Sequence, residues 1–524
     1  MPTYDAIVVG AGPNGLVAAN HLLDAGWSVL VLEEQPHVGG AVHSDRSVDP
    51  DFVHDTFSSF YPLATASPVM RHLHLERHGL RWQHAPAVLG HASPDGWAML
   101  HRDREVTARL LDEQHRGDGE RWLALCARWD VIGDGLVGAL MTPFPPVRAG
   151  LSLLARLRAG GGLDLVKQLL SPAAELGHGF GGPSPGLLLG GNAAHADIPL
   201  DATGSGLMGF LMTMLGQTVG FPVPEGGAGE LAAALSRRAT SLGGEVRTGS
   251  RVDEVVVEDG RATAVRTEHG ERFAARRAVL ADVVASRLYG DLVPDEALPA
   301  KLHQRMRTFR LDPGTVKVDW ALDGPVPWER PPPYPPGTVH VADSVGEMSE
   351  ASGQIASGAV PARPFLLVGQ MTTADPTRSP SGTEALWAYT HVPQEVRTDA
   401  GDGGVRGVWD HDDNERFADR MQARIERLAP GFGARVRARR VLGPRELEAR
   451  DANLVGGAIN GGTSALHQQL FLRPVPGSGR APTPVRRLYL ASASAHPGGG
   501  VHGAPGMNAA RAALAHHRLR LGRS

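Results

Sequence analysis

Cysteine is almost absent from this chain of 524 residues, in which Cys126 is the only one. A single cysteine allows neither a disulfide framework nor a C-x-x-C redox pair, so chemistry relayed through an intrachain disulfide is excluded. A reducing, cytoplasmic compartment fits this composition best. Aromatic residues are also few, at 5% of the chain, and lysine occurs only three times among 52 basic residues.

Strong net charge and long apolar runs are lacking as well. The formal net charge of -4 gives no electrostatic footprint for nucleic acid, so a nucleic-acid partner is disfavoured. The longest apolar stretch, residues 206–221, falls short of a membrane span and is interrupted by Gln217 and Thr218. The first ten residues show no signal-peptide pattern. We therefore expect a cytoplasmic protein of more than one domain, since the length exceeds what one core supports.

The chain opens with a pattern that is typical of dinucleotide binding. An apolar strand at 6–9 leads into the glycine pattern G-x-G-x-x-G at 10–15, and a helical run and a second strand at 29–32 follow. The three glycines permit a tight turn, a close approach of a pyrophosphate and close helix–strand packing, and the phosphate lies at the helix N-terminus. An acid closing the second strand can accept the ribose hydroxyls. The residues expected to contact a cofactor here are Gly10, Gly12, Pro13, Asn14, Gly15, Glu33 and Glu34.

A second glycine cluster lies almost five hundred residues later, at 496–508. It follows an apolar strand at 488–491 and leads into an alanine-rich helix with Pro505 at its start, so it offers a second helix N-terminus. We expect both glycine clusters to contact the same cofactor. A flexible hinge is the alternative. The match of Gly204, Gly206 and Gly209 to the first glycine pattern is rejected, because a proline and two aspartates stand where a buried strand is required.

Between the two clusters the chain leaves the nucleotide domain and returns. Residues 70–223 have mostly helical patterns, including 120–141 and 162–177, whereas 311–400 read as strands and 414–430 as an amphipathic helix. The predicted fold is α/β, with a discontinuous Rossmann-like domain of residues 1–70, 224–310 and 480–524. The predicted substrate domain, of residues 71–223 and 311–479, is α+β and is built on a mainly antiparallel sheet with a helical portion.

Other candidate sites have plain structural alternatives. His72, His74 and His78 lie close together, but no further ligands follow at metal-type spacing, so no metal site is expected. His195 is a candidate to face the substrate, with Asp197 and Gln468, and packing roles are the alternative for each.

Several stretches together resemble the phytoene-dehydrogenase-related branch of the amine-oxidase superfamily of FAD-dependent oxidoreductases. They are "EEQPHVGGAVHS" (33–44), "HDTFSSFYPLATASP" (54–68), "PEGGAGELAAAL" (224–235), "NLVGGAINGG" (453–462) and "HPGGGVHGAPGMNAARAAL" (496–514), and they occur in the same order as in that branch. The resemblance implies FAD in a glutathione-reductase-type domain. One departure is Ala41, where many relatives have arginine. The further contacts to FAD implied by the resemblance are Gly39, Gly40, Ala41, Val42, Val252, Gly499, Gly500, Val501, His502, Gly506, Met507 and Asn508.

The resemblance also implies a function. It is that of an oxidoreductase that abstracts hydride from a largely apolar organic substrate by desaturation or dehydrogenation, with oxygen or a quinone as electron acceptor. An amine or amino-acid oxidase is one alternative, and a flavin-stabilised binding protein without turnover is another. A peripheral membrane contact through 132–170 and 203–221 is an expectation that competes with an internal substrate tunnel lined by the same stretches.

Lys317 is the candidate catalytic residue on the substrate domain. The segment 313–329 resembles the first substrate-domain strand of amine-oxidase-type flavoproteins, in which a lysine reaches a water bound to flavin N5. An inward-facing lysine in an apolar strand needs a polar partner. The alternative is a solvent-exposed face on which Lys317 pairs with Asp319.

Overall fold

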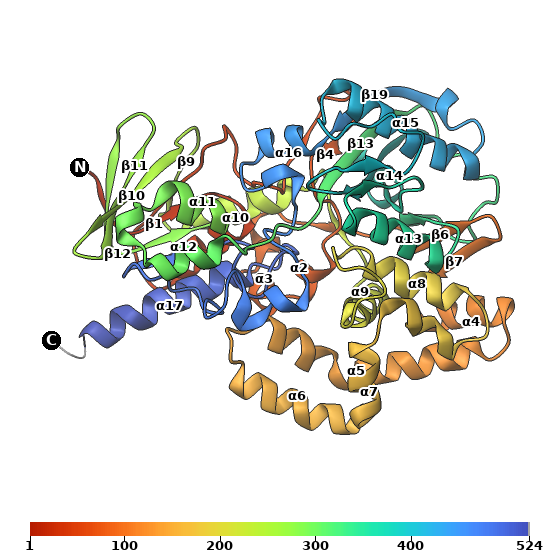
Figure 1. Cartoon of the computed structure of the whole chain (residues 1–524), viewed down its shortest axis with the longest axis horizontal. Coiled ribbons are helices and arrows are strands. Elements are labelled where there is room, and N and C mark those ends of the chain that lie inside the picture. The colour runs from red at the N-terminus through yellow and green to blue at the C-terminus, as the bar shows by residue number, and fades with distance from the viewer. Residues whose placement is uncertain (522–524) are drawn as a thin grey trace.

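The computed structural model describes residues 1–521. Figure 1 shows one sheet at the left, a second sheet at the upper right, and a group of helices at the lower right. In the described residues, the first sheet has seven strands. They are β1 (Thr3–Val9), β2 (Val29–Leu32), β9 (Glu245–Arg247), β10 (Val252–Glu258), β11 (Arg261–Thr267), β12 (Arg272–Ala281) and β20 (Leu488–Leu490).

The first sheet is parallel at its centre. β1 pairs with β2 and β12, β2 pairs with β9, and β12 pairs with β20, all in parallel. β10 and β11 form an antiparallel meander at the edge. Residues 6–9 of β1 and the whole of β2 are apolar because both of their faces are buried. Helix α1 (Pro13–Asp24) packs between α10 (Gly229–Ser241) and α17 (Ala504–Leu521). The predicted α/β fold with a Rossmann-like sheet is confirmed.

The second sheet also has seven strands in the described residues and is antiparallel apart from the β14–β6 pair. In spatial order they are β19 (Val436–Leu442), β13 (Gly314–Leu322), β17 (Glu384–Val392), β16 (Leu366–Gln370), β14 (Pro336–Val341), β6 (Ala87–Ser93) and β7 (Gly96–Leu100). The interpretation of 70–223 as mostly helical missed β6 and β7. This hairpin turns at Pro94-Asp95-Gly96, a strong turn sequence.

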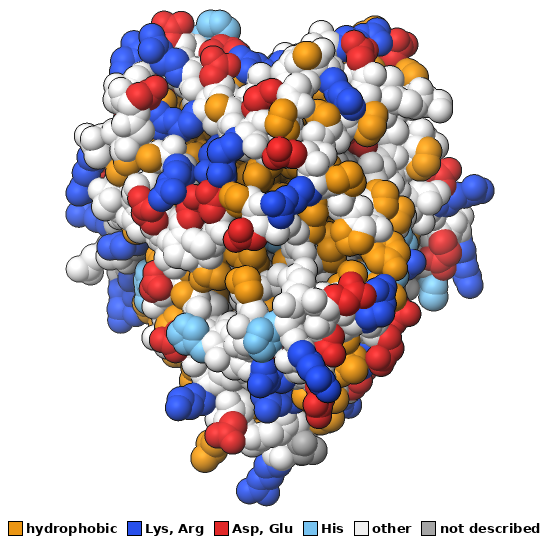
Figure 2. All heavy atoms as spheres, turned by 90° about the vertical axis from the view of Figure 1, so that its right-hand side faces the viewer, with side chains coloured by type: hydrophobic (Ala, Val, Ile, Leu, Met, Phe, Trp, Pro, Cys, Tyr) orange, Lys and Arg blue, Asp and Glu red, His pale blue; other side chains and the backbone are white. Residues whose placement is uncertain are grey.

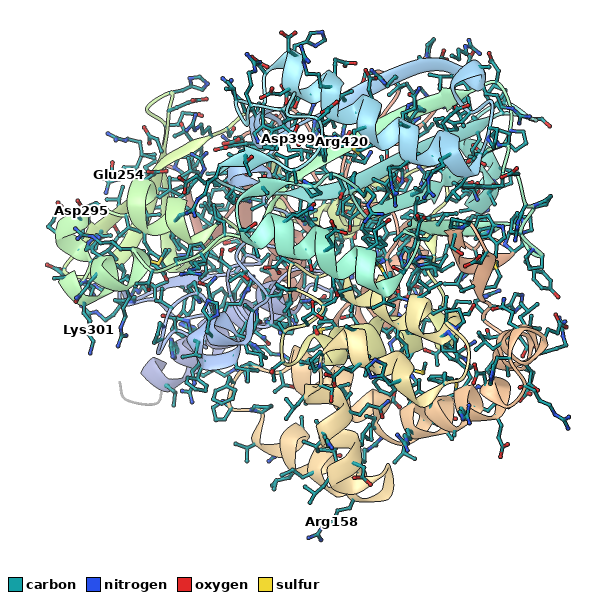
Figure 3. The ribbon with its side chains drawn as sticks, turned by 45° about the vertical axis from the view of Figure 1, so that its right-hand side comes forward. Arg158, Glu254, Asp295, Lys301, Asp399 and Arg420 are labelled. Carbon is teal, nitrogen blue, oxygen red and sulfur yellow. The ribbon has the colours of Figure 1, made fainter. Side chains whose placement is uncertain are left out.

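Helix α15 (His411–Leu428) covers the second sheet with the face that its sequence predicts. Phe417, Met421 and Ile425 are fully buried in one cluster with the sheet. On its outer side, Arg420 pairs with Asp399 of the short strand β18 (Thr398–Asp399) at 2.7 Å, and both are labelled at the top of Figure 3.

The inserted helices lie beneath the second sheet in Figure 1. They are α4 (Arg104–Gln114), α5 (Asp118–Met141), α6 (Val147–Ala159), α7 (Gly162–Leu170), α8 (Ser184–Ala193) and α9 (Ser205–Thr218). The helix predicted at 162–177 ends at Leu170, because Pro172 interrupts it. No strand precedes the glycine match at 204–209, which instead begins α9, so its rejection is correct.

The remaining elements are short apart from α13. They are β3 (Ser44–Asp45), β4 (His54–Asp55), β5 (Trp82–Gln83), β8 (Val223–Pro224), β15 (Ala359–Val360), α2 (Pro62–Ala66), α3 (Pro68–His72), α11 (Ala285–Arg287), α12 (Ala300–Met306), α13 (Val345–Ala356), α14 (Met371–Ala374) and α16 (Pro444–Arg450). Across residues 1–521, helices with the length and apolarity of a membrane span are absent.

All strands of the first sheet fall within 1–70, 224–310 and 480–524, and those of the second within 71–223 and 311–479. The exact domain boundaries stay a prediction.

A buried ionic network joins the β3–β4 hairpin to the second sheet. Arg440 of β19 contacts Asp45 at 2.7 Å and Asp319 at 2.8 Å. Arg378 binds both Asp55 and Asp375 at 2.9 Å, and all three side chains are fully buried.

Candidate cofactor and substrate site

The turn between β1 and α1 has no room for side chains. A Cβ on Gly15 would lie 2.2 Å from the carbonyl oxygen of Gly10, and one on Gly12 would lie 2.7 Å from Oδ2 of Asp282. Gly10 has a φ of 94°, and a Cβ on it would lie 2.8 Å from the carbonyl oxygen of Asp282. These approaches explain why all three positions are glycine, and the amide of Gly15 in the first turn of α1 donates to Oδ2 of Asp282 at 2.8 Å.

The second glycine cluster brings another helix N-terminus to the same place. A Cβ on Gly506 would lie 1.9 Å from the carbonyl oxygen of Asn14, so the first turns of α17 and α1 touch through their backbones. Pro505 occupies the first turn of α17, where it loses no hydrogen bond. Two helix N-termini therefore meet, and together they favour bound negative charge.

A cavity lies at the N-terminus of α1. Thirteen of the predicted cofactor contacts line it: Gly10, Gly12, Pro13, Asn14, Glu33, Glu34, Gly40, Ala41, Val42, Val252, Gly499, Gly500 and Val501. The residues of this cavity suit a dinucleotide. They offer a glycine cradle that a Cβ would fill, the start of α1, the glycine-rich segment that leads to α17, and a buried Oδ1 of Asn14 without a hydrogen-bond partner among the described residues.

Six predicted contacts do not line the cavity and lie behind its wall. They are Gly15, Gly39, His502, Gly506, Met507 and Asn508. The contacts that they make in the structure are with other parts of the protein. The amide of Gly39 donates to the Ala11 carbonyl at 2.9 Å, and Asn508 Nδ2 reaches the carbonyl of Met141 at 3.4 Å. Contact between any of these residues and a cofactor stays a prediction.

Glu33 lies where the sequence predicts a ribose-binding acid. Its carboxylate accepts the amides of Ala11 at 2.7 Å and Gln35 at 2.9 Å. Burial raises the pKa of Glu33 to about 7, although these hydrogen bonds oppose the shift. The side chain is thus fixed at the end of β2 with its carboxyl group on the cavity wall.

Sequence reasoning missed several polar residues of the cavity wall. They are Arg251, Asp282, Arg287, Asp291, Asp451, Asn453, Ser492 and Ser494. Asp282 could have been found, because it directly follows the strand predicted at 278–281 and ligands of α/β sheets bind beyond the carboxyl ends of strands. Asp451 carried no such signal. It follows α16 and reaches the cavity only through the tertiary fold.

Lys317 is buried, so the solvent-exposed alternative is wrong, although its pairing with Asp319 is present. Its Nζ donates to the Asp55 carbonyl oxygen at 2.8 Å and to the Asp319 carboxylate. Lys317 is only 3% exposed and lines neither this cavity nor the one described below. The structure gives it a role in the buried ionic network, and its catalytic role stays a prediction.

His195 points into a cluster of histidines. Its Nε2 lies 2.8 Å from Nε2 of His340, and His91 is the cross-strand neighbour of His340. Burial, with a smaller effect of His391, lowers the pKa of His195 to about 3, so the imidazole is neutral. The structure gives His195 a packing role, and substrate contact stays a prediction.

The other polar candidates have partners of their own. Asp197 accepts the Thr463 hydroxyl and the amide of Ser464, and Gln468 bonds the backbone of Arg310 through both ends of its amide. Within residues 1–521 there is no group of three or more side chains suited to hold a metal ion.

A second cavity of about 680 Å³ lies beside the first. Its walls come from 194–200, 309–313, α13, the end of β17 and 463–467, and they are largely apolar. The loop 459–465 separates the two cavities, since Ile459 and Gly461 line the first and Thr463 and Ala465 line the second. Apolar side chains also gather in a hollowed band across the face shown in Figure 2.

Comparisons with known proteins agree with this architecture. Residues 8–75 match the family described as NAD(P)-binding Rossmann-like domain. The chain is 26% identical to a phytoene dehydrogenase of Streptomyces griseus, over 86% of this chain and 84% of that one. The fold resembles that of a putrescine oxidase mutant, with a TM-score of 0.58, 18% identity and full coverage of both chains.

A relative from Mus musculus is named pyridine nucleotide-disulfide oxidoreductase domain-containing protein 2. It is 30% identical over 97% of this chain and 93% of its own. This chain itself cannot form an internal redox disulfide, because Cys126 is its only cysteine. Several relatives are named as desaturases or dehydrogenases, several structural neighbours are named as amine oxidases, and this chain is an oxidoreductase. It belongs to the family of pyridine nucleotide-disulfide oxidoreductase domain-containing protein 2, and it is similar to phytoene dehydrogenases in sequence and to amine oxidases in fold.

Proposed function

We propose that the first cavity binds FAD and that the chain abstracts hydride from a largely apolar organic substrate bound in the second cavity. The observation that carries this proposal is the meeting of two helix N-termini at a glycine cradle, directly beside an apolar cavity. A flavin bound there would supply the hydride acceptor. Oxygen or a quinone is the proposed final electron acceptor.

The residues of the chain have three tasks in this proposal. The amides at the start of α1, with Pro13 and Asn14, hold the pyrophosphate, and Glu33 holds the ribose. Gly499, Gly500 and Val501 place the N-terminus of α17 near the reacting ring, where it stabilises negative charge. The apolar wall of the second cavity excludes water and orients the substrate.

The alternative of an amine or amino-acid oxidase has less support. An aromatic pair at the ring would favour amines. Trp387 and Tyr389 do stack, with ring centroids 5.9 Å apart, but neither lines the first or the second cavity.

The first test is the visible spectrum of the purified protein, together with identification of the released cofactor by chromatography. Bound FAD is expected. The second test is anaerobic mixing of the loaded protein with long-chain unsaturated or saturated hydrocarbons, alcohols and amines. Bleaching by an apolar compound supports the proposal, and bleaching only by amines supports the oxidase. Flavin that no compound reduces supports a binding protein without turnover.

We further propose that the apolar substrate arrives from a membrane surface through helices α6 and α7. Val147, Leu151 and Leu154 of α6 are each more than 60% exposed, and Leu163 of α7 is 86% exposed. Helix α6 carries basic residues and no acidic ones. Figure 3 shows Arg158, near the end of α6, projecting from the bottom of the molecule. An apolar face flanked by cations suits an anionic lipid surface.

The proposed route runs from this surface past the segment 463–471 to the second cavity. The ring of Phe144, just before α6, lies 5.2 Å from that of Phe471, and exposed Leu466 stands between two residues that line the cavity. Helix α9, in contrast, is mostly buried, which favours the interior alternative for 203–221. Flotation with anionic vesicles tests the proposal. Leu151→Asp should abolish co-flotation, whereas Val408→Asp, at an exposed position away from α6, should not. Equal flotation of all variants would contradict it.

A further inference from the structure

Three buried carboxyl groups line the first cavity without any cation to pair with. Glu33, Asp282 and Asp451 are 6%, 5% and 9% exposed, and none forms an ion pair in the described residues. Elsewhere in the chain, the buried carboxylates of Asp55 and Asp319 are paired with arginine or lysine. Unpaired buried carboxylates are costly, so this cluster needs either protons or a ligand.

Asp282 is the member of this group that stands against the glycine turn. Its Oδ2 accepts the amide of Gly15 at 2.8 Å and lies 2.7 Å from where a Cβ on Gly12 would be. Its backbone is fixed by hydrogen bonds to Val9 and Asn453. Its Oδ1 has no hydrogen-bond partner among the described residues, and the residue lines the cavity. One carboxyl oxygen is thus left for a ligand.

The charged groups around Asp282 do not neutralise it. Glu33 at the end of β2 and Asp451 after α16 interact with it electrostatically, and Glu34 and Asp291 line the same cavity. The two cations of the cavity wall are engaged elsewhere. Arg287 pairs with Glu448 at 2.7 Å, and Arg251, which precedes β10, is largely exposed and lies 3.8 Å from Glu34.

The protonation of these groups follows from their surroundings. Burial raises the pKa of Asp282 to about 8, and the charges of Asp451 and Glu33 push it in the same direction. Burial also raises the pKa of Glu33 to about 7 and that of Asp451 to about 6. Because they interact, the three carboxyl groups titrate as one coupled set. A pyrophosphate placed at the end of α1 would add further negative charge beside them.

We propose that the cavity binds its dinucleotide together with one proton, and that Asp282 carries this proton as a neutral carboxylic acid. The inference rests on the proposed cofactor site. The proton comes from solvent and stays on the carboxyl group, which then donates a hydrogen bond where a carboxylate would repel phosphate. Cofactor retention is consequently linked to pH, and it weakens when the solution is too alkaline to supply the proton.

The experiment is a titration of the apoprotein with FAD between about pH 6.5 and about pH 9.5, followed by flavin fluorescence. Below about pH 8 Asp282 already holds its proton, so its own contribution to the affinity should change little. At higher pH the affinity should fall by up to about tenfold per pH unit, which is the limit for uptake of one proton. Calorimetry at about pH 9, in two buffers of different ionisation enthalpy, measures the same proton directly on the unaltered chain.

Asp282→Asn keeps the shape and the uncharged state at every pH. Its FAD affinity should not fall between about pH 8 and about pH 9.5, so the ratio of its affinity to that of the parent protein should rise over this range. Glu384→Gln is the matched control. Glu384 is buried with a pKa raised to about 7, but it bonds Thr372 and Thr373 outside the cavity, so this variant should keep the parent profile.

The possible results distinguish a failure of this inference from a failure of the proposed function. A parent protein that binds FAD with no pH dependence and no proton uptake would overturn the inference, as would an Asp282→Asn variant with the parent slope. Failure of the parent protein to bind FAD at any pH would instead refute the proposed function.

Discussion

The contact between Gly506 and Asn14 gives a direct test of the claim that both glycine clusters build one site. A Cβ at residue 506 would lie 1.9 Å from the Asn14 carbonyl oxygen, about 1.5 Å closer than an ordinary contact. Gly506 lies in a helix, so alanine itself is conformationally acceptable there. Gly506→Ala must therefore push the N-termini of α1 and α17 apart. Overpacking of this kind costs about 1–3 kcal/mol.

The effect on the cofactor follows from the displaced helix end. A helix N-terminus stabilises a nearby anion by about 0.3–2 kcal/mol, so misplacing it should weaken FAD binding by up to roughly thirtyfold. The assay is the ratio of flavin to protein after gel filtration, with the melting temperature measured in parallel.

Gly353→Ala is the control for this prediction. Gly353 lies in α13 with no atom within 4 Å of an added Cβ, so alanine should leave flavin content unchanged and stabilise the helix by about 0.5–1 kcal/mol. A Gly506→Ala protein with parental flavin content and melting temperature would refute the reasoning that the two helix ends are held together through this contact.

Four further changes test other parts of the structure. Gly12→Val should abolish flavin retention because its side chain enters the cradle, and a variant that keeps full flavin content would contradict the assignment. Arg378→Met should destabilise the protein by about 3–5 kcal/mol in urea unfolding, whereas the exposed Arg109→Met should cost under about 1 kcal/mol; equal costs would refute the buried network. Lys317→Met should lower the melting temperature, and an unchanged value would contradict its structural role, while flavin reoxidation slowed at least tenfold would support the catalytic one. Because the pKa of Asp282 is raised in the folded apoprotein, this group contributes stability below about pH 4, and the contribution is lost as the pH rises through about 8. Asp282→Asn should therefore raise the melting temperature of the apoprotein most at alkaline pH. A difference in melting temperature that stays constant with pH would refute this.

The parts of the site that local sequence dictates could be predicted. The turn at 10–15, the strand 29–32 and the helix start at Pro505 all follow from local propensity and glycine chemistry, and the structure places them as expected. Partners that lie far away in the sequence could not be predicted. Lys317 pairs with Asp319 of its own strand, but it also donates to the carbonyl of Asp55, which no local pattern could identify.

The β6–β7 hairpin was not predicted from the sequence for a different reason. Its strands lie within a long region of helical periodicity, and their pairing with β14 depends on residues more than two hundred positions away. The turn residues at 94–96 gave a local signal, but it predicts a hairpin without saying which sheet the hairpin joins.

The separation of the two glycine clusters has a physical consequence for how the site forms. The first cluster lies at residues 10–15 and its partner turn near Gly506, so the cradle is complete only when both ends of the chain have folded. Closing so long a loop costs only slightly more entropy than closing a short one, because the cost grows with the logarithm of length. That cost is offset by the parallel pairing of β20 with β12, which places the second cluster, and by the packing of α17 on α1. The buried network of Asp55, Arg378 and Asp375 fixes the early β3–β4 hairpin to later segments in the same way. In the proposed cofactor site, the return of the chain supplies a second helix N-terminus, whereas a single βαβ unit supplies only one.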